Sequence, residues 1–265
     1  MTGLSTAHIP PAIKKKSPEF SYWDGGGLIE AKLSGWKIPQ KGGGKRGAVR
    51  LFSRQSRKRL LNLMGMIKRV EKPIFVTLTY PLEFSNESSD WKIDLEKFHK
   101  RMLRKFEKVS MVWKLEPQRR GAPHYHILVW GVGYANLRNY TSKCWYEAVG
   151  SGDLKHLAAG VRVEKIRDWN GMMSYASKYL GKVLDEEKLK VLGWDRPGRF
   201  WGVKGRKFLP VAIKKSVVLL GDEEVYDLFR LMRRFAGIKA RQYRSLTMLT
   251  RNPNRWAEVL AKDGH

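Results

Sequence analysis

The sequence SMVWKLEPQRRGAPHYHILVW, residues 110–130, reads as two β-strands joined by a short loop. β-Branched and aromatic residues fill both runs, whereas prolines, arginines and a glycine fill the loop PQRRGAP between them. His124 and His126 are two residues apart on the second run, so their side chains leave the same face of a strand. If the runs pair as a hairpin with Glu116 opposite His124, Glu116 points to that face as well.

These three side chains are candidate ligands of one divalent ion. Two imidazoles and a carboxylate can hold Mg²⁺ or Mn²⁺ and leave coordination positions open for a phosphate. The alternative is that two surface histidines happen to lie on one strand, because a His-x-His pair alone is a short motif. Glu116 at a workable register favours the metal site over that alternative.

The residues around this hairpin predict a chain of the α+β class. PIFVTLTYP at 73–81 and GVRVEKI at 160–166 are further strands, and 215–220 is an apolar strand. Apolar residues at helical spacing run from Ser53 to about Lys68, and Ser89 or Asp90 caps a second helix. Further helices are expected at about 137–148, 168–183 and 223–235. We expect one antiparallel sheet of about five strands, with flanking helices packed mainly on one face.

Changes in composition along the chain suggest that it has three parts. Residues 1–46 hold clusters of proline, lysine and glycine without periodicity, which predicts a flexible basic arm with a short ordered piece around Trp23. Residues 47–210 contain the hairpin and form the expected central domain with its N-terminal helix. Residues 211–265 are expected to add a strand, a helix and a basic tail.

The charge of the chain indicates a polyanionic partner. The 265 residues include 52 Lys and Arg against 25 Asp and Glu, a net charge of +27. So many positive charges repel one another in a compact fold unless a polyanion offsets them. Nucleic acid is the most common polyanion in cells. Composition alone fits a non-enzymatic ribosomal or histone-like binder equally well. A membrane is not expected to be a partner, because no apolar run approaches the ~20 residues of a spanning helix.

The setting is expected to be reducing and intracellular. The start MTGLSTAHIPPAIKKK has no apolar stretch behind a basic head, so a secretory signal is not expected. The single cysteine, Cys144, excludes disulfides within the chain and a cysteine-rich zinc site.

Two tyrosines on one predicted helix are candidate nucleophiles. Tyr175 and Tyr179 are four residues apart, hence on one helix face, and each is followed three residues later by a lysine, Lys178 or Lys182. A phenol is a poor nucleophile until a polarised phosphate and nearby cations assist it. Lysine supplies such a charge and neutralises charge that develops on a phosphate. The alternative is an ordinary amphipathic helix with tyrosines packed on the sheet.

Other basic and aromatic residues are candidates for DNA contact. Arg119 and Arg120 in the hairpin loop are placed to grip phosphate, and a solvated turn is the alternative. Arg196, Arg199 and Trp201 belong to a stretch that mixes cations with rings, as a groove for single strands would. Trp194 and Phe200 belong to the same stretch, and the alternative there is core aromatics beside surface arginines.

The order of these motifs resembles that of the HUH endonucleases, named for a histidine–hydrophobic–histidine pattern. FVTLTYP, HYHILVWG and YASKYLGK look like the three family motifs, and PQRRGAPHYHIL and RPGRFWGVKG resemble the replication initiators of single-stranded-DNA phages and rolling-circle plasmids. The resemblance covers about residues 53–210. It implies metal ligation by Glu116, His124 and His126, with Tyr175 as the nucleophile and Tyr179 as a second one.

The resemblance implies an initiator that works in the cytoplasm of a bacterial host cell, nicks one strand of origin DNA and stays linked to the 5′ phosphate. The free 3′-hydroxyl then primes synthesis. No Gly-x-x-x-x-Gly-Lys-Ser/Thr motif occurs, so a host helicase and polymerase are the expected partners, and no small-molecule substrate is expected. The rivals are a non-enzymatic RNA- or DNA-binding protein, and a relaxase or transposase with the same chemistry.

Overall fold

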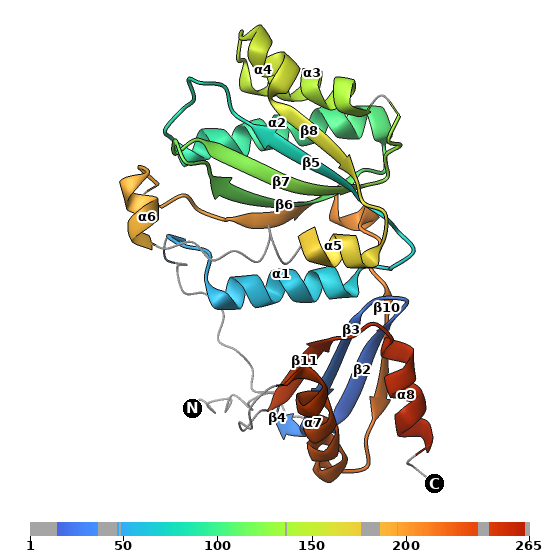
Figure 1. The fold of residues 1–265 in the computed structure, drawn as a ribbon. Helices are drawn as coiled ribbons and strands as arrows, with labels where there is room; N and C mark the ends of the chain where they lie inside the picture. Colours follow the sequence, from blue (N-terminus) through green and yellow to red (C-terminus); the bar gives the residue numbers. More distant parts are fainter. Residues whose placement is uncertain are drawn as a thin grey trace, which may run out of the picture. The chain divides into compact units, whose positions relative to one another are not determined.

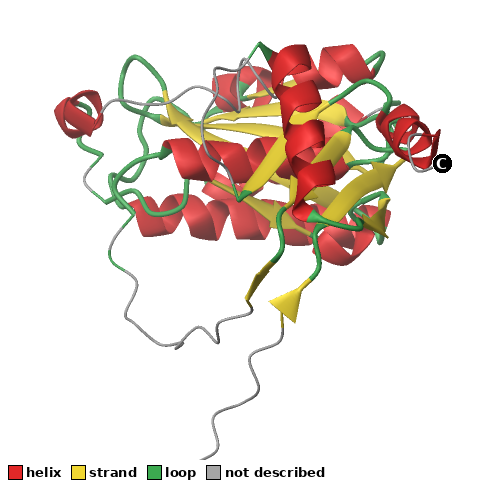
Figure 2. Cartoon of the chain, turned by 90° about the horizontal axis from the view of Figure 1, so that it is seen from below, coloured by secondary structure: helices red, strands yellow, loops and turns green. Residues whose placement is uncertain are grey.

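The chain folds into two units, each with its own sheet and core (Figure 1). The structure, a computed structural model, describes residues 15–36, 47, 49–135, 137–175, 186–194, 196–237 and 244–262. The larger unit comprises Asp24–Gly27 and Gly47–Ile213, and the smaller unit comprises Met1–Trp23, Leu28–Arg46 and Lys214–His265. Both contain helices and strands (Figure 2), which confirms the α+β class.

The larger unit is built on a five-stranded antiparallel sheet with the order β8-β5-β7-β6-β9. Its strands are β5 (Ile74–Thr79), β6 (Ser110–Pro117), β7 (Pro123–Trp130), β8 (Val161–Lys165) and β9 (Trp201–Lys204). The predicted strands at 73–81, 110–117, 124–132 and 160–166 all lie here. The sheet therefore has the expected number of strands and the expected antiparallel pairing.

Helices cover both faces of this sheet, so the expectation of helices mainly on one face is wrong (Figure 1). On one face lie α2 (Ser88–Phe106) and α3 (Leu137–Val149), and the Tyr125 hydroxyl donates to the Trp91 carbonyl at 2.8 Å. On the other lie α1 (Arg54–Met66) and α5 (Trp169–Tyr175). Helices are needed on this second face because Phe75 and Leu128, which lie on it, are apolar and must be shielded from water.

The helix starts follow capping chemistry only in part. Ser53 caps α1, with its side-chain oxygen accepting from the Ser56 backbone N–H at 3.2 Å. Helix α2 begins at Ser88 after Glu87, so neither Ser89 nor Asp90 is its cap. Asp90 instead lies in the first turn, where its carboxylate suits the helix dipole and accepts from the Ser85 hydroxyl at 2.6 Å. The short elements α4 (Leu154–Ala159), α6 (Glu186–Val191) and η2 (Arg206–Phe208) complete the unit.

The smaller unit pairs strands from the two ends of the chain. Its four-stranded sheet has the order β10-β2-β3-β11, formed by β2 (Glu19–Asp24), β3 (Leu28–Lys32), β10 (Ile213–Val218) and β11 (Ser245–Leu249). The two-residue strands β1 (Lys15–Lys16) and β4 (Gly35–Trp36) pair with each other. Helices α7 (Asp222–Ala236) and α8 (Pro253–Lys262) complete the unit. Its core includes Phe20, Ile29, Phe229, Met232 and Trp256.

The structure differs here from the flexible arm expected at 1–46 and the basic tail expected after 235. Residues 15–36 form strands well beyond a short piece around Trp23, whereas 1–14 and 37–46 lie outside the described residues. The physical reason is that β3 pairs with β11, with Leu28 opposite Leu249. No local pattern can report a partner strand more than two hundred residues away.

Gly205 gives a test of this packing. It precedes η2 with φ +63°, and a Cβ there would clash with the Val109 carbonyl oxygen at the start of β6. We expect Gly205→Ala to lower the free energy of unfolding by about 2–4 kcal/mol, because left-handed strain adds to the clash. Gly193→Ala is the matched control, since Gly193 has φ +77° and no atom within 4 Å of the place where a Cβ would lie, and should cost only about 1 kcal/mol. If urea denaturation shows that both variants lose the same free energy of unfolding, the close contact between η2 and the start of β6 is not what makes Gly205 necessary.

Candidate functional site

Three neighbouring strands bring the candidate ligands onto one face of the sheet. On β6 and β7, Glu116 lies opposite His124, which confirms the register predicted for the hairpin. One rung further, Lys114 lies opposite His126. On the other side of β7, Thr79 of β5 lies opposite His124. Because directly opposed residues share a face, these side chains converge on the side of the sheet that α1 and α5 cover.

The contacts among the candidate ligands are close. The Nε2 atom of His126 lies 3.5 Å from the Glu116 Oε2 atom. The rings of His124 and His126 are nearly perpendicular, with centroids 4.6 Å apart. His124 Nδ1 and the Thr79 hydroxyl form a hydrogen bond of 3.2 Å. A hydrogen bond to one ring nitrogen fixes the orientation of the imidazole and leaves its Nε2 as the atom for a ligand.

Lys114 is a member of this cluster that the sequence reasoning missed. Its side chain is fully buried, forms a hydrogen-bonded ion pair with Glu116, and places its ammonium 4.8 Å from the centroid of the Phe52 ring. The signal was present, since Lys114 is two residues before Glu116 on the same strand and so shares its face. Thr79 was likewise not among the candidate site residues, although β5 pairs with β7 and places it beside His124.

The protonation states of the cluster suit metal ligation. Burial raises the pKa of Glu116, but its hydrogen bond with His126 and the Lys114 charge outweigh this and hold that pKa below its usual value. Burial and then the nearby His126 lower the pKa of His124 to about 4, although Glu116 acts in the opposite direction. At neutral pH, Glu116 is therefore ionised and His124 is neutral, the forms in which both bind metals.

The cluster fits a divalent ion in its donor types and in its placement on the sheet. As the side chains stand, however, no three His, Cys, Asp or Glu residues in the described part of the chain are arranged to hold a metal ion. The two carboxylate oxygens of Glu116 have different neighbours, since Oε1 is paired with the Lys114 ammonium and Oε2 lies 3.5 Å from His126 Nε2.

The candidate nucleophiles lie at the edge of the described chain. Helix α5 ends at Tyr175, on the side of the sheet where α1 lies (Figure 1). Tyr179, Lys178 and Lys182 fall outside the described residues, as does the rest of the helix predicted to Val183. Tyr80 and Tyr125 are different, because both are buried in the core and burial raises the pKa of each phenol. Neither of these two is therefore placed to attack a phosphate.

Arg120 is engaged within the protein. Its guanidinium donates to the carbonyl oxygens of Tyr80 (2.7 Å), Pro81 (2.7 Å) and Leu82 (3.0 Å). It also lies 5.2 Å from the centroid of the Phe84 ring. The hairpin loop thereby holds the segment that follows β5, a role that the sequence reasoning did not foresee when it assigned this arginine to DNA.

The other predicted DNA contacts divide into exposed cations and packed rings. Arg119, Arg196 and Arg199 are exposed. Trp201 is half-buried on β9, and its indole N–H donates to the Ser56 hydroxyl of α1 at 2.8 Å. Trp194 and Phe200 are core residues with stacked rings, as the alternative reading expected. The predicted cations of this stretch thus lie at the surface, whereas its rings mainly hold the fold together.

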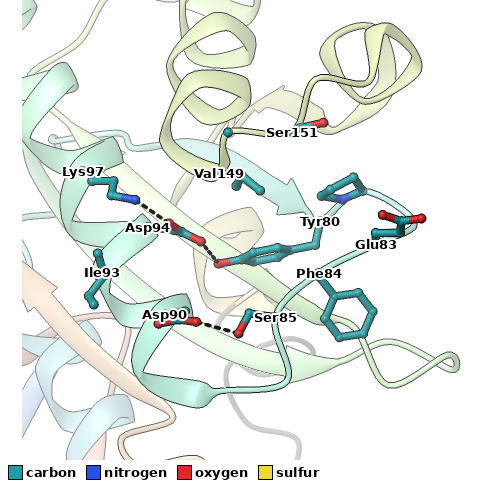
Figure 3. Close-up of a pocket in the computed structure, with 12 residues that line it drawn as sticks. Tyr80, Glu83, Phe84, Ser85, Asp90, Ile93, Asp94, Lys97, Val149 and Ser151 are labelled. Atoms are coloured by element: carbon teal, nitrogen blue, oxygen red, sulfur yellow. Dashed lines mark hydrogen bonds and ion pairs between the residues drawn. The ribbon is translucent and has the colours of Figure 1, made fainter.

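A cavity of about 410 Å³ has no histidine in its lining. Figure 3 shows the side chains that line it. In it the Tyr80 hydroxyl donates to Asp94 at 3.1 Å, and Lys97 approaches the same carboxylate at 3.1 Å. Asp90 and Glu83 also line this cavity. Its carboxylates repel phosphate, so this cavity does not suit a nucleic-acid backbone.

The comparisons with known proteins agree with the class that the fold and the histidine cluster suggest. Residues 73–184, which include β5 to β8 and the whole cluster, match the family model of the replication-associated proteins of the ORF2 type. The predicted resemblance to replication initiators is therefore confirmed for this segment.

One protein that the chain resembles is a replication-associated protein of Pseudomonas phage Pf3. It is 29% identical over 161 residues, which cover 58% of this chain and 56% of the relative. The chain thus spans just over half the length of that relative. The search of solved structures found no match. None of the described helices is long and apolar enough to span a membrane.

The bonds of Arg120 predict a structural role that can be measured. We expect Arg120→Met to speed amide hydrogen exchange in peptides covering residues 80–88 and to cost about 1 kcal/mol of stability, because three carbonyl oxygens of the segment that follows β5 lose their donor. Arg119→Met, on the same loop, is the matched control and should change neither quantity. Unchanged exchange in Arg120→Met would show that the guanidinium is not needed there and is free for DNA.

Proposed function

We propose that this chain nicks one strand of origin DNA through a tyrosine and so starts rolling-circle replication. The observation that carries the proposal is the convergence of Glu116, His124 and His126 on one sheet face, within the segment that matches the replication-associated family. A host helicase and polymerase are the proposed partners, and the single-stranded origin is the proposed substrate.

Glu116, His124 and His126 would hold Mg²⁺ or Mn²⁺, which when bound polarises the scissile phosphate and orients it. The other residues of the cluster prepare this site. Thr79 orients the His124 ring through its hydrogen bond. Lys114 favours the ionised form of Glu116, whose charge the ion needs. The lysine also keeps positive charge at the site, and so reduces the charge repulsion that a phosphate would meet at a carboxylate.

Tyr175 and Tyr179 are the proposed nucleophiles. The phenolic oxygen gives up its proton and forms a bond to phosphorus, the bond from phosphorus to the 3′ oxygen breaks, and that oxygen takes up a proton. The products are a 5′-phosphotyrosine link and a free 3′-hydroxyl. Lys178 and Lys182 would offset the charge that develops on the phosphate. With two tyrosines, one can stay linked to the 5′ end while the other attacks the regenerated junction.

The rival of a non-enzymatic RNA-binding sheet is disfavoured by the packing. Such a sheet presents aromatic rings on an open face, where bases stack. Here α2 and α3 cover one face of the larger sheet and α1 and α5 the other (Figure 1). The polar cluster at the end of the second face is instead made of groups that bind metal and phosphate.

The first functional prediction concerns the metal. Cleavage of single-stranded origin DNA should require a divalent ion and stop with a chelator. His124→Ala and His126→Ala should abolish nicking while salt-sensitive DNA binding stays largely intact, because binding rests on many Lys and Arg contacts. Glu116 is a poorer test, since its removal leaves the buried Lys114 without its carboxylate and destabilises the fold. Undiminished nicking in chelator would contradict the proposed site.

The second functional prediction concerns the tyrosines. Tyr175→Phe and Tyr179→Phe should each keep part of the single-strand cleavage, and the double variant should keep none. Phenylalanine retains the ring, so the change removes only the hydroxyl and one hydrogen bond. Tyr226→Phe, an exposed tyrosine of the smaller unit, is the control and should cleave normally. A Tyr179→Phe protein that completes repeated strand transfers at the normal rate would refute the two-tyrosine mechanism.

A further inference from the structure

A second pocket in the larger unit is lined by cations. It has a volume of about 350 Å³ and lies between the first turns of α2 and the segment that leads into β9. Lys92, Arg199 and Lys204 line it, although the Lys204 ammonium is paired with the Glu96 carboxylate outside the lining. Ser88 and Ser89 add hydroxyls, and Trp113 is among the apolar residues of the wall. None of its lining residues is acidic, unlike those of the cavity around Asp94.

Lys92 is the cation of this pocket whose charge is left without an acceptor. Its amino group is shielded from water and makes no hydrogen bond with the described residues. It lies 5.2 Å from the centroid of a Trp113 ring and 5.9 Å from that of Tyr125. Burial lowers the pKa of Lys92 to about 7. A buried amine without a hydrogen bond costs stability, and an anion in the adjacent pocket would supply the missing acceptor.

The pocket lies on the opposite sheet face from the histidine cluster. Trp113 and Lys114 are consecutive on β6, so their side chains point to opposite faces. Trp113 lines the cationic pocket, whereas Lys114 contacts Glu116. The sheet itself therefore separates the two places, and Arg199 lies just before its edge strand β9.

We propose that this pocket binds a backbone phosphate of single-stranded DNA, outside the scissile position. The proposal rests on the proposed function, because it assumes that the chain holds a single strand. Lys92 would turn from the rings towards the phosphate, which its flexible four-carbon stem permits. Arg199, exposed at the mouth, would provide a further donor. The Trp113 ring is buried and offers no stacking surface, so the pocket recognises the backbone and not a base.

The test compares Lys92→Met with Lys105→Met in the full chain. Both remove one positive charge from α2, but Lys105 is exposed and does not line the pocket. Binding of a labelled oligothymidylate is measured by anisotropy over a range of salt concentrations, with chelator present so that no cleavage occurs. Loss of one phosphate contact should make the slope of log Kd against log salt concentration smaller by ~0.7 and raise Kd about fivefold at ~0.1 M salt. Lys105→Met should leave the slope unchanged.

A second measurement guards against misfolding and separates DNA from a free anion. Lys92→Met should unfold at the same or a higher temperature than the wild type, because the unpaired amine is gone. Inorganic phosphate and thymidine monophosphate are tested as competitors of the oligonucleotide. Weak competition by both supports a site for the DNA backbone, whereas saturable displacement at low concentration by either overturns it in favour of a small-anion site.

The inference fails if Lys92→Met binds with the wild-type slope, or if both lysine variants lose affinity equally. The first result leaves the nicking proposal standing, since the wild type still cleaves. A wild-type chain that neither binds nor cleaves single strands would instead refute the proposed function itself.

Discussion

The pairing of β6 with β7 in one register is the constraint on which the site depends. A slip by a single residue would send Glu116 to the face that α2 covers, away from both histidines. The loop fixes the register, since the Gln118 N–H donates to the Ala122 carbonyl at 2.8 Å and Gly121 adopts φ +82°. The hydrogen bond from Tyr125 to the Trp91 carbonyl fixes β7 against α2 from the other side. A turn and a core contact therefore decide where three polar side chains meet.

Charge balance within the cluster is the second constraint. Lys114 has no exposed surface, and a buried ammonium is stable only if it is paired. Its partner is Glu116, the same carboxylate that we propose as a metal ligand. One carboxylate therefore balances the charge of the buried lysine and belongs to the proposed site. Arg120 lies outside the cluster but supports it, because its hydrogen bonds hold the chain that directly follows Thr79.

The sequence was informative wherever the structure is local. Alternation along 110–130 predicted both strands of the hairpin and the position of Glu116 opposite His124, and helical spacing predicted α1 from Ser53. Long-range pairing left no such signal, so β3 and β11 were read as parts of an arm and a tail. The roles of charged side chains were also ambiguous in the sequence. Arg119 and Arg120 are neighbours in the same loop, yet it is Arg120 that donates hydrogen bonds to the carbonyl oxygens of the segment after β5. Lys114 was missed because a lysine within a strand suggests solvent, not a buried ion pair.

In the proposed reaction a tyrosine of this chain becomes joined to the 5′ phosphate of the cut strand. The most direct measurement incubates the full chain with Mn²⁺ and single-stranded origin DNA labelled at either its 5′ or its 3′ end, followed by a denaturing gel. The account predicts that only the 3′ label moves with the protein, while the 5′-labelled fragment is released with a free hydroxyl that a polymerase can extend. Cleavage that leaves both labels free of protein, or a 5′ label bound to it, would contradict the account.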